Sequence, residues 1–390
     1  MKIHHENPET VIPPSVTPVR AAKAAYSLAG ETAPQPLAPA RWDWDEVRRV
    51  LVVRLRSIGD TVLATPSLYA LRRFLPEARI DVLLEDWVAP LLDASPDVDR
   101  VITVKRHDTS SRLRVVQSLR AEGYDVAFNL HGGSTAALLT WASGARHRVG
   151  YQSYRYARLH NHAAPAASEL WRREKTHSVE QQLALLGWTG VPVSDRPPTR
   201  LNVTVEAERS ITCRLRDAHL GEGENFALIH PAAAFDSKQW AAENFARVVE
   251  QFHARNIPAV VIAAPGEESV IRAINDATRT PLVALTNLAL PEVTALAARS
   301  HLFVGNDSGI AHIAAAVQTP SVVIFGSSNV AHWRPWTNAP AEVVREEMPC
   351  APCSGYTCSE FDVPQCIRRV SVERVNDAIE RVLKAVMGDG

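Results

Sequence analysis

The chain has 390 residues, of which 46% are hydrophobic and 22% charged, and its formal net charge is −1. This size and composition allow substantial buried cores in two or three domains, and the near-neutral charge excludes a globally basic nucleic-acid-binding protein. No apolar run approaches the ~20 residues needed to span a bilayer, and the first residues lack the apolar stretch of a secretory signal, so a cytoplasmic protein is expected.

The first 40 residues are rich in proline and alanine and show no sustained hydrophobic period. A segment of this composition cannot bury enough apolar surface to fold alone. We therefore predict a flexible extension over residues 1–45 and exclude it from the fold.

From residue 46, short β-branched runs alternate with helical stretches. The expected strands are 50–55, 80–84, 101–104 and 125–130, and the expected helices are 61–74, 87–92 and 112–121. Nearly continuous apolar strands separated by helices are typical of a parallel sheet covered on both faces. Residues 46–200 are therefore predicted to form a doubly wound, Rossmann-like α/β domain.

A proline-containing stretch over residues 191–204 predicts a linker, after which the alternation restarts. The expected strands are 226–230, 259–263, 282–285, 302–304 and 321–325, and the expected helices are 242–255, 268–277, 292–298 and 308–316. Residues 201–345 thus form a second predicted α/β domain, followed over 346–390 by a cysteine-containing loop and a last helix. Two such domains face each other across a cleft at the carboxyl ends of their strands, where ligands bind in open α/β sheets.

Residues 304–312 are the most informative stretch, because they read as a buried strand that ends at the start of a helix. Unpaired N–H groups and the positive end of the helix dipole bind anions at such a point. The expected ligand is phosphate, held near Asp307, Ser308, Gly309 and His312. The alternative is that Asp307 or Ser308 merely caps the helix.

Two further candidate residues come after the first predicted strand of each domain. Asp60 comes directly after the first strand of the N-terminal domain, where a carboxylate either caps the next helix or acts as a general base toward a hydroxyl. Lys238 lies in the loop after the strand predicted over 226–230. A loop lysine is usually only solvated, but a lysine facing the anion site would neutralise a diphosphate.

A basic segment and a cysteine cluster complete the candidates. Residues 145–177 hold six arginines and Lys175 against two glutamates, which predicts either a surface that faces an anion or a solvated basic face.

The clustered cysteines are Cys350, Cys353, Cys358 and Cys366. Disulfides are not expected in a reducing cytoplasm, so these thiols either hold a structural zinc or iron–sulfur site or are ordinary. Cys213, alone in a helical stretch, is expected to be buried.

Taken together, these motifs resemble the bacterial heptosyltransferases, the family 9 glycosyltransferases that build the inner core of lipopolysaccharide. The resemblance runs from residue 49 to the last helix and rests on residues 54–60, His230-Pro231, Lys238-Gln239-Trp240, residues 305–309 with His312, and residues 325–328 with Trp333 and Pro335. It implies a GT-B fold, an acceptor bound by the N-terminal domain and a nucleotide sugar, typically ADP-heptose, bound by the C-terminal domain.

The resemblance also implies an inverting transfer in which Asp60 takes a proton from the acceptor hydroxyl. Lys238 and the helix start at 307–312 would hold the leaving diphosphate, so no metal cofactor is required for transfer. Glu268 falls near the family position that contacts the ribose, and Glu267 matches equally well.

For the acceptor, Arg146, Arg148 and His131 are the candidates. They suit an anionic, lipid-linked glycan at the inner membrane face, with peripheral attachment of the enzyme there. Two alternatives stay open: a family 9 transferase that uses another nucleotide sugar for a different surface glycan, and a GT-B-like sugar-nucleotide epimerase. A sugar-binding module without catalysis is a third class, which an Asp60 variant would separate from the others.

Overall fold

The computed structural model describes residues 33–221, 223–353 and 357–388. From Pro34 onward the described chain forms one compact unit. Residues 1–32, most of the predicted extension, lie outside the described residues. No described helix combines the length and the apolar character needed to cross a bilayer.

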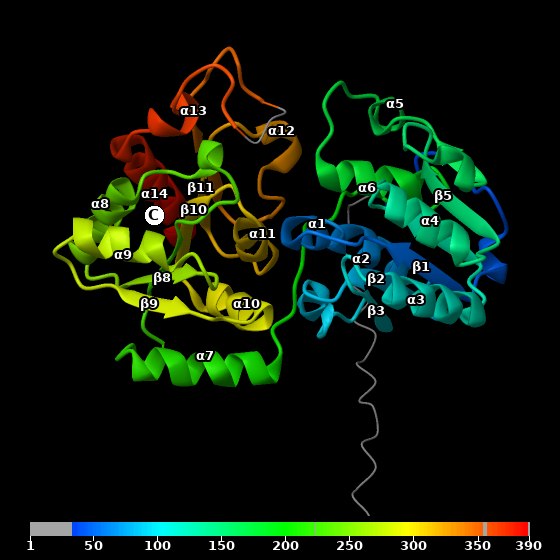
Figure 1. Ribbon diagram of the computed structural model, residues 1–390, viewed down its shortest axis with the longest axis horizontal. Coiled ribbons are helices and arrows are strands. Elements are labelled where there is room, and N and C mark those ends of the chain that lie inside the picture. The colour runs from blue at the N-terminus through cyan, green and yellow to red at the C-terminus, as the bar shows by residue number, and fades with distance from the viewer. Residues whose placement is uncertain (1–32, 222, 354–356, 389–390) are drawn as a thin grey trace, which may run out of the picture. The chain divides into compact units, whose positions relative to one another are not determined.

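Two parallel sheets organise the described chain, one in each half (Figure 1). The strands of the first sheet are β1 (Arg49–Val53), β2 (Arg79–Glu85), β3 (Arg100–Val104), β4 (Val126–Asn129), β5 (His147–Tyr151) and β6 (His162–Ala164). The strands of the second sheet are β7 (Ala227–His230), β8 (Ala259–Ala263), β9 (Val283–Thr286), β10 (Leu302–Asn306), β11 (Ser321–Phe325) and β12 (Ala341–Arg345). The strand orders are β3-β2-β1-β4-β5-β6 and β12-β11-β10-β7-β8-β9, which confirms the predicted pair of doubly wound α/β folds.

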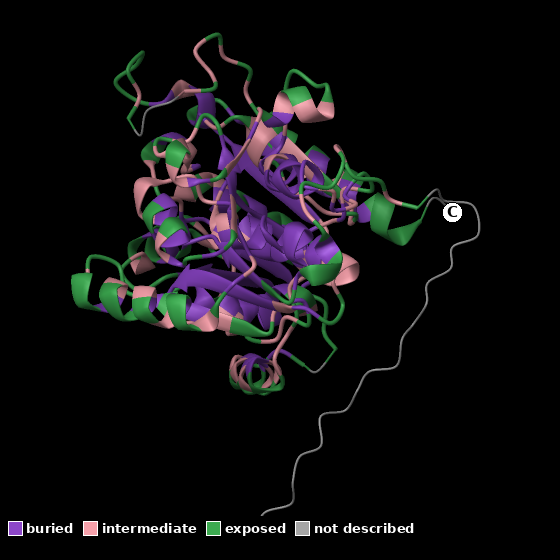
Figure 2. Ribbon diagram, turned by 90° about the vertical axis from the view of Figure 1, so that its right-hand side faces the viewer, coloured by how far each residue is buried: buried purple, intermediate pink, exposed green. Residues whose placement is uncertain are grey.

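Helices flank both sheets, and the central strands are buried, whereas the edge strands β3, β9 and β12 are partly exposed (Figure 2). The helices of the N-terminal half are α1 (Ile58–Val62), α2 (Thr65–Phe74), α3 (Thr109–Glu122), α4 (Ser134–Ala142), α5 (Ala167–Trp171) and α6 (Ser178–Gly187). Those of the C-terminal half are α7 (Val205–Asp217), α8 (Ala242–His253), α9 (Glu268–Ala277), α10 (Leu290–Arg299), α11 (Gly309–Ala316), α12 (Val330–Trp333), α13 (Gln365–Arg368) and α14 (Val372–Met387). Short 3-10 turns are η1 (Trp44–Glu46), η2 (Ala89–Leu92), η3 (Ala157–Leu159) and η4 (Asp236–Lys238). The last helix, α14, packs on β11 and β12 of the second sheet.

The helix predicted over 61–74 is two helices, α1 and α2. Pro66 lies in the first turn of α2. Proline has no N–H and its ring clashes with the preceding turn, so it is tolerated at a helix start but not inside a longer helix. The break leaves α1 as a short separate helix that contacts α11 of the other half.

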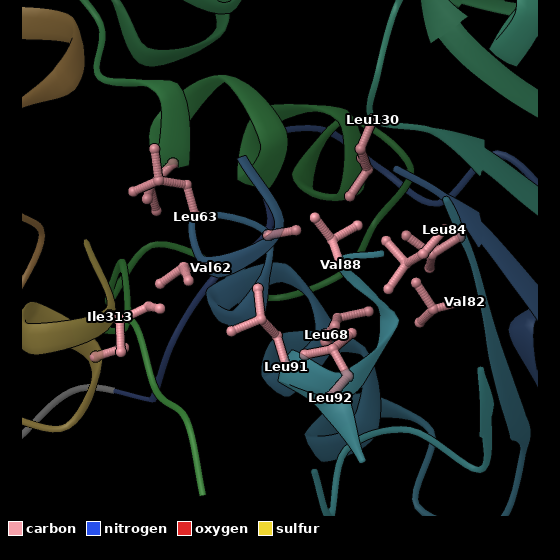
Figure 3. Packing of buried hydrophobic residues seen from close by; sticks show 14 of the residues in the cluster. Val62, Leu63, Leu68, Val82, Leu84, Val88, Leu91, Leu92, Leu130 and Ile313 are labelled. Atoms are coloured by element: carbon pink, nitrogen blue, oxygen red, sulfur yellow. The ribbon is translucent and has the colours of Figure 1, made fainter. Parts of the chain in front are cut away.

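The hydrophobic core is continuous between the two halves at this contact. Val62 of α1, Leu63 directly after it and Ile313 of α11 belong to one buried cluster, and Figure 3 shows Ile313 beside Val62. Burial of apolar surface on both sides holds the two halves together where their strand ends meet.

The prediction of a flexible extension is wrong for residues 33–45. The N–H of Leu37 donates to the carbonyl of Gly187 at 3.0 Å, and Nε1 of Trp44 donates to the carbonyl of Thr189 at 2.8 Å. Trp44 is buried in the core and Trp42 packs against it. These few large apolar side chains bury enough surface to order a segment that is otherwise proline-rich.

We expect Trp44→Ala to lower the free energy of unfolding by about 3 to 5 kcal/mol, because it opens a core cavity and removes the partner of a buried carbonyl. Trp141→Ala is the control, since Trp141 is half exposed on α4 and should cost less than about 1 kcal/mol. Urea unfolding followed by circular dichroism measures both. Equal losses would show that residues 33–45 are no more than a surface loop.

Candidate active site

Asp60 lies in the first turn of α1, just beyond the carboxyl end of β1. Its Oδ2 accepts from the N–H of Ser57 at 3.2 Å, and its Oδ1 is ion-paired with the guanidinium of Arg54. Arg54 is buried and also donates to the carbonyl of Leu130 at 2.8 Å, which ties the ends of β1 and β4 together. Asp60 therefore does cap the helix start, and its side chain still keeps 23% of its surface exposed.

That exposed face of Asp60 opens on a cavity of about 290 Å³. Other side chains in its wall are His131, Tyr154 and Gln181 from the N-terminal half and His332 and Trp333 from α12. A second cavity of about 410 Å³ shares Tyr151, Tyr154, Gln181 and His332 with the first and extends to Lys175. Together they form a groove with aromatic and polar walls, contributed by both halves, that leads to the Asp60 carboxylate. We call it the Asp60 groove.

The structure brings His131 into this groove. Its N–H donates to Oδ1 of Asn129 at 3.1 Å, and its ring Nδ1 is buried without a hydrogen-bond partner among the described residues. Burial, followed by the positive charge of Arg54, lowers the pKa of His131 to about 4. The ring is therefore neutral near pH 7 and can accept or donate a hydrogen bond to a bound hydroxyl.

Lys238 and Asp307 meet at the carboxyl edge of the second sheet. Nζ of Lys238 lies 2.8 Å from Oδ2 of Asp307, and the Asp307 side chain is only 6% exposed. The hydroxyl of Ser328 donates to the same carboxylate. Asn306 fastens the surrounding loop, since its Nδ2 donates to the carbonyl of Pro231 at 2.6 Å and its Oδ1 accepts from the N–H of Trp240 at 3.2 Å. The lysine is thus held in a fixed position.

The start of α11 lies beside this pair. Ser308 is the N-cap residue of α11 but makes no side-chain cap hydrogen bond; its hydroxyl lies 3.2 Å from Nδ1 of His230 instead. Asp307 points to Lys238 rather than to the helix. Neither Asp307 nor Ser308 therefore caps α11 with its side chain. The first N–H groups of α11 remain able to bind an anion, as is usual at a helix start.

His312, one turn further along α11, is fully enclosed. Its Nδ1 has no hydrogen-bond partner among the described residues. Burial lowers the pKa of the His312 ring below its ordinary value, although the nearby carboxylates of Asp307 and Asp60 oppose the shift. His312 thus lies near a carboxylate from each half of the chain.

Two glycines let the halves approach this closely. A Cβ added at Gly59 would lie 2.7 Å from Cδ2 of His312, and one added at Gly309 would lie 2.7 Å from Cβ of Ile58. Both distances are shorter than real carbon contacts. The first turns of α1 and α11 therefore touch through glycine, and Asp60, Asp307 and Lys238 all lie close enough to His312 to affect its pKa.

We expect Gly59→Ala to lower kcat about 10²-fold while the affinity for the donor nucleotide changes little, because the methyl group would displace the Asp60 helix from α11 by a fraction of an ångström to an ångström. Gly221→Ala is the matched control, since an added Cβ there meets nothing closer than 3.4 Å. Steady-state rates and nucleotide titrations provide the comparison. Wild-type kcat in Gly59→Ala would show that this contact has no part in turnover.

The stability of the site depends on pH through His230. Burial lowers the pKa of His230 to about 4 from an ordinary value of 6.5. Between these values the unfolded chain binds a proton that the folded chain excludes, so stability falls as the pH decreases from about 6.5 to about 4, by up to about 3 kcal/mol. Urea unfolding at several pH values measures the loss, and His230→Gln should reduce its slope. An unchanged slope would contradict the burial of a neutral His230.

Arg146 and Arg148 do not line the Asp60 groove, so the structure does not bring them to Asp60, and acceptor binding by these two residues stays a prediction. They lie at the start of β5, whereas the groove residue Tyr151 lies at its end, about 10 Å further at ~3.3 Å per residue. Arg146 pairs with Glu46 at 3.5 Å, and Arg148 donates to the carbonyl of Leu159 at 3.2 Å. The basic segment over residues 145–177 was interpreted from its charge alone, without knowing at which end of strand β5 the two arginines lie.

Glu268 is the first residue of α9 and follows the carboxyl end of β8, the neighbour of β7. Its carboxylate accepts from the N–H of Gly266 at 3.1 Å, and hydrogen bonds of this kind from backbone N–H groups lower its pKa. Glu267 accepts from the N–H of Ala264 at 3.2 Å. Both carboxylates lie at the carboxyl edge of the sheet, and the ribose contact stays a prediction.

The cysteines are placed differently from one another. Cys213 is exposed on α7, so its predicted burial is wrong; it falls on the solvent side of an amphipathic helix. The four clustered cysteines line a common cavity next to Ser237 and Ser327.

Local sequence pattern did not single out three residues that line the cavity beside Asp60: Arg54, Tyr154 and His332. Arg54 stood in a quoted motif, and a buried position at a strand end followed by a carboxylate six residues on would have suggested the ion pair. Tyr154 follows β5, a strand that was not predicted. His332 comes from the other half of the chain, and no local pattern links it to Asp60.

Comparisons with known proteins agree with this geometry. The profile of glycosyltransferase family 9 (heptosyltransferase) matches residues 112–363. The lipopolysaccharide heptosyltransferase 3 of Escherichia coli is 30% identical over 302 residues, which cover 73% of this chain and 85% of that protein.

Two solved structures share the fold. A family 9 glycosyl transferase from Veillonella parvula superposes with a TM-score of 0.75 at 21% identity, covering 86% of this chain and 97% of its own. The E. coli ADP-heptose lps heptosyltransferase II superposes with a TM-score of 0.72 at 22% identity, covering 87% and 100%. The paired sheets are thus the GT-B arrangement. The chain belongs to glycosyltransferase family 9, the heptosyltransferase family, and is a glycosyltransferase.

Proposed function

We propose that this enzyme transfers a heptose from ADP-heptose to an inner-core acceptor of lipopolysaccharide, with inversion at the anomeric carbon. The observation that carries the proposal is the contact of α1, the helix that holds Asp60, with α11, whose uncapped start follows the Lys238–Asp307 pair. The names of the relatives, a lipopolysaccharide heptosyltransferase and an ADP-heptose heptosyltransferase, support this choice of donor and acceptor.

In the proposed reaction, Asp60 accepts the proton of an acceptor hydroxyl as that oxygen attacks the anomeric carbon of the heptose. The bond from that carbon to the diphosphate oxygen breaks, and ADP leaves with an additional negative charge. Lys238 and the N–H groups at the start of α11 neutralise this charge, as a divalent cation does elsewhere. Arg54 orients Asp60 through their ion pair.

Asp307 has a positioning role in this proposal. Its carboxylate is buried and already occupied by Lys238 and Ser328, and a second anion next to it would be repelled. Asp307 therefore aims the lysine, while Lys238, Gly309 and the backbone of α11 contact the diphosphate. Glu268 is proposed to accept hydrogen bonds from the ribose hydroxyls.

The acceptor is proposed to lie along the Asp60 groove, with Tyr154, His131 and Gln181 contacting its sugars. An anionic lipid-linked glycan presented at the inner face of the membrane fits this role, because Lys175 supplies a cation at the far end of the groove. Peripheral attachment of the enzyme at that face belongs to the same proposal.

Thermal-shift measurements with ADP, ADP-heptose, and UDP- and GDP-sugars test the donor. We expect ADP and ADP-heptose to raise the melting temperature selectively. Stabilisation by a uridine or guanosine nucleotide alone would contradict the proposed donor and assign the same fold to another surface glycan.

A further inference from the structure

Trp87 is a large aromatic side chain that the reaction described above does not use. It follows the end of β2 by two residues, and 45% of its surface is exposed. The residues directly after it, Val88 and Ala89, are buried, so the chain turns into the core here while the indole stays outside. A flat apolar ring in contact with water gains free energy when a ligand covers it.

Trp87 lies at the same edge of the first sheet as Asp60. The strands β1 and β2 are parallel neighbours. Beyond their last paired residues, the N–H of Glu85 still donates to the carbonyl of Leu55 at 2.7 Å. The two chains therefore leave the sheet side by side, one toward α1 and Asp60, the other toward Trp87.

The surroundings of Trp87 also join the wall of the Asp60 groove. Burial is the main cause of the lowered pKa of the groove residue His131, and the carboxylate of Glu85 lies near enough to oppose that shift. Val88 follows Trp87 and Leu130 precedes His131, and these two apolar side chains belong to one buried cluster (Figure 3). Trp87 thus stands next to the His131 side of the groove.

Two hydrogen bonds hold Trp87 in place. Nε1 of its indole donates to Oε2 of Glu85 at 2.9 Å, and its backbone N–H donates to Oδ1 of Asp86 at 3.0 Å. Glu85 is only 7% exposed, and a buried carboxylate binds a donor strongly. The ring is therefore fixed with one face open. A fixed aromatic ring loses little conformational freedom when a ligand stacks on it.

We propose that Trp87 stacks on a sugar ring of the acceptor glycan, at a subsite beyond the sugar that receives the heptose. The proposal rests on the proposed function, which supplies the glycan. The face of an indole is electron-rich and attracts the weakly positive C–H groups on the apolar side of a sugar ring. Arg56 and Asp86 are exposed on the same two chain segments and supply a donor and an acceptor for the sugar hydroxyls.

The subsite serves binding and not the chemical step. Trp87 does not line the cavity that holds the Asp60 carboxylate, so the sugar stacked on it is not the one that reacts. A contact made equally in the bound substrate and in the transition state changes KM and leaves kcat unaltered.

Steady-state transfer to lipid A that carries two Kdo sugars, at saturating ADP-heptose, tests this inference. We expect Trp87→Ala to raise the KM for the acceptor ~10-fold and to leave kcat within ~2-fold of wild type. Trp87→Phe keeps an aromatic face and should hold the KM within ~3-fold of wild type. Trp141→Ala is the matched control, since Trp141 is 49% exposed on α4, and it should change neither constant.

A calorimetric titration of the ADP-loaded enzyme with the same acceptor separates this inference from the proposed function. We expect ~10-fold weaker binding by Trp87→Ala and unchanged binding by Trp141→Ala. If the unsubstituted enzyme binds the acceptor without transferring heptose, the proposed reaction fails while the titration still decides on Trp87. Wild-type KM and affinity in a Trp87→Ala enzyme whose melting temperature still rises with ADP would overturn the subsite. Equal weakening by Trp87→Ala and Trp87→Phe would contradict stacking on the ring face.

Discussion

Asp60→Asn is expected to lower kcat by about 10³-fold without weakening the binding of the donor nucleotide. The amide keeps the shape of the side chain but is not basic, so the acceptor hydroxyl loses the group that takes its proton. The proposed donor-binding groups belong to the other half of the chain. Initial rates of transfer, together with the rise in melting temperature produced by ADP, separate the two effects.

Asp60→Asn has a structural consequence that the experiment must separate from catalysis. Arg54 is buried and would lose its carboxylate partner, so the melting temperature should fall by several degrees. Asp45→Asn, at an exposed position of η1, controls for a simple loss of charge. If a folded Asp60→Asn enzyme that responds to ADP keeps more than a tenth of the wild-type kcat, Asp60 is not the base.

Lys238→Met is expected to lower kcat by 10²- to 10³-fold, the usual effect of removing one group that stabilises a developing charge. It also leaves Asp307 buried without its cation, which should lower the free energy of unfolding by about 3 kcal/mol. Transfer rates and urea unfolding measure the two consequences in the same preparation. Lys384→Met, an exposed position on α14, is the matched control.

The double variant Lys238→Met/Asp307→Asn distinguishes the two roles of the lysine. Removing the unpaired carboxylate should restore most of the lost stability, whereas the rate should stay low because the diphosphate still lacks its cation. Recovery of both stability and rate would show that Lys238 only balances the charge of Asp307. The positioning role proposed for Asp307 would then have no support.

Local sequence pattern was sufficient to predict the strand ends and the candidate residues that follow them. The apolar run before Asp307 and the small residues after it predicted a buried strand and a helix start, and the structure has β10 and α11 there. Asp60 and Lys238 were predicted in the same way, because every parallel strand delivers its last residues to the same edge of the sheet. The meeting of the two edges followed from placing one α/β fold opposite another.

The remaining features depend on contacts that no local pattern records. Residues 33–45 look disordered by composition, yet Trp44 is held by a residue 145 positions away. The arginines at 146 and 148 were read as a basic surface because β5 was not predicted, and without the strand its direction was unknown. The pairing of Gly59 with His312 and of Gly309 with Ile58 requires both halves at once, so neither glycine could be assigned this role from its neighbours in sequence.

A transfer assay measures the proposed reaction itself. Purified enzyme is incubated with ADP-heptose and a lipid A acceptor that carries two Kdo sugars, and the product is analysed by mass spectrometry, with Asp60→Asn in parallel. We predict a product heavier by one heptose and release of ADP with the unsubstituted enzyme, and almost none with the variant. Equal product from the two enzymes would show that Asp60 is not the base, and transfer from a uridine or guanosine sugar but not from ADP-heptose would contradict the proposed donor.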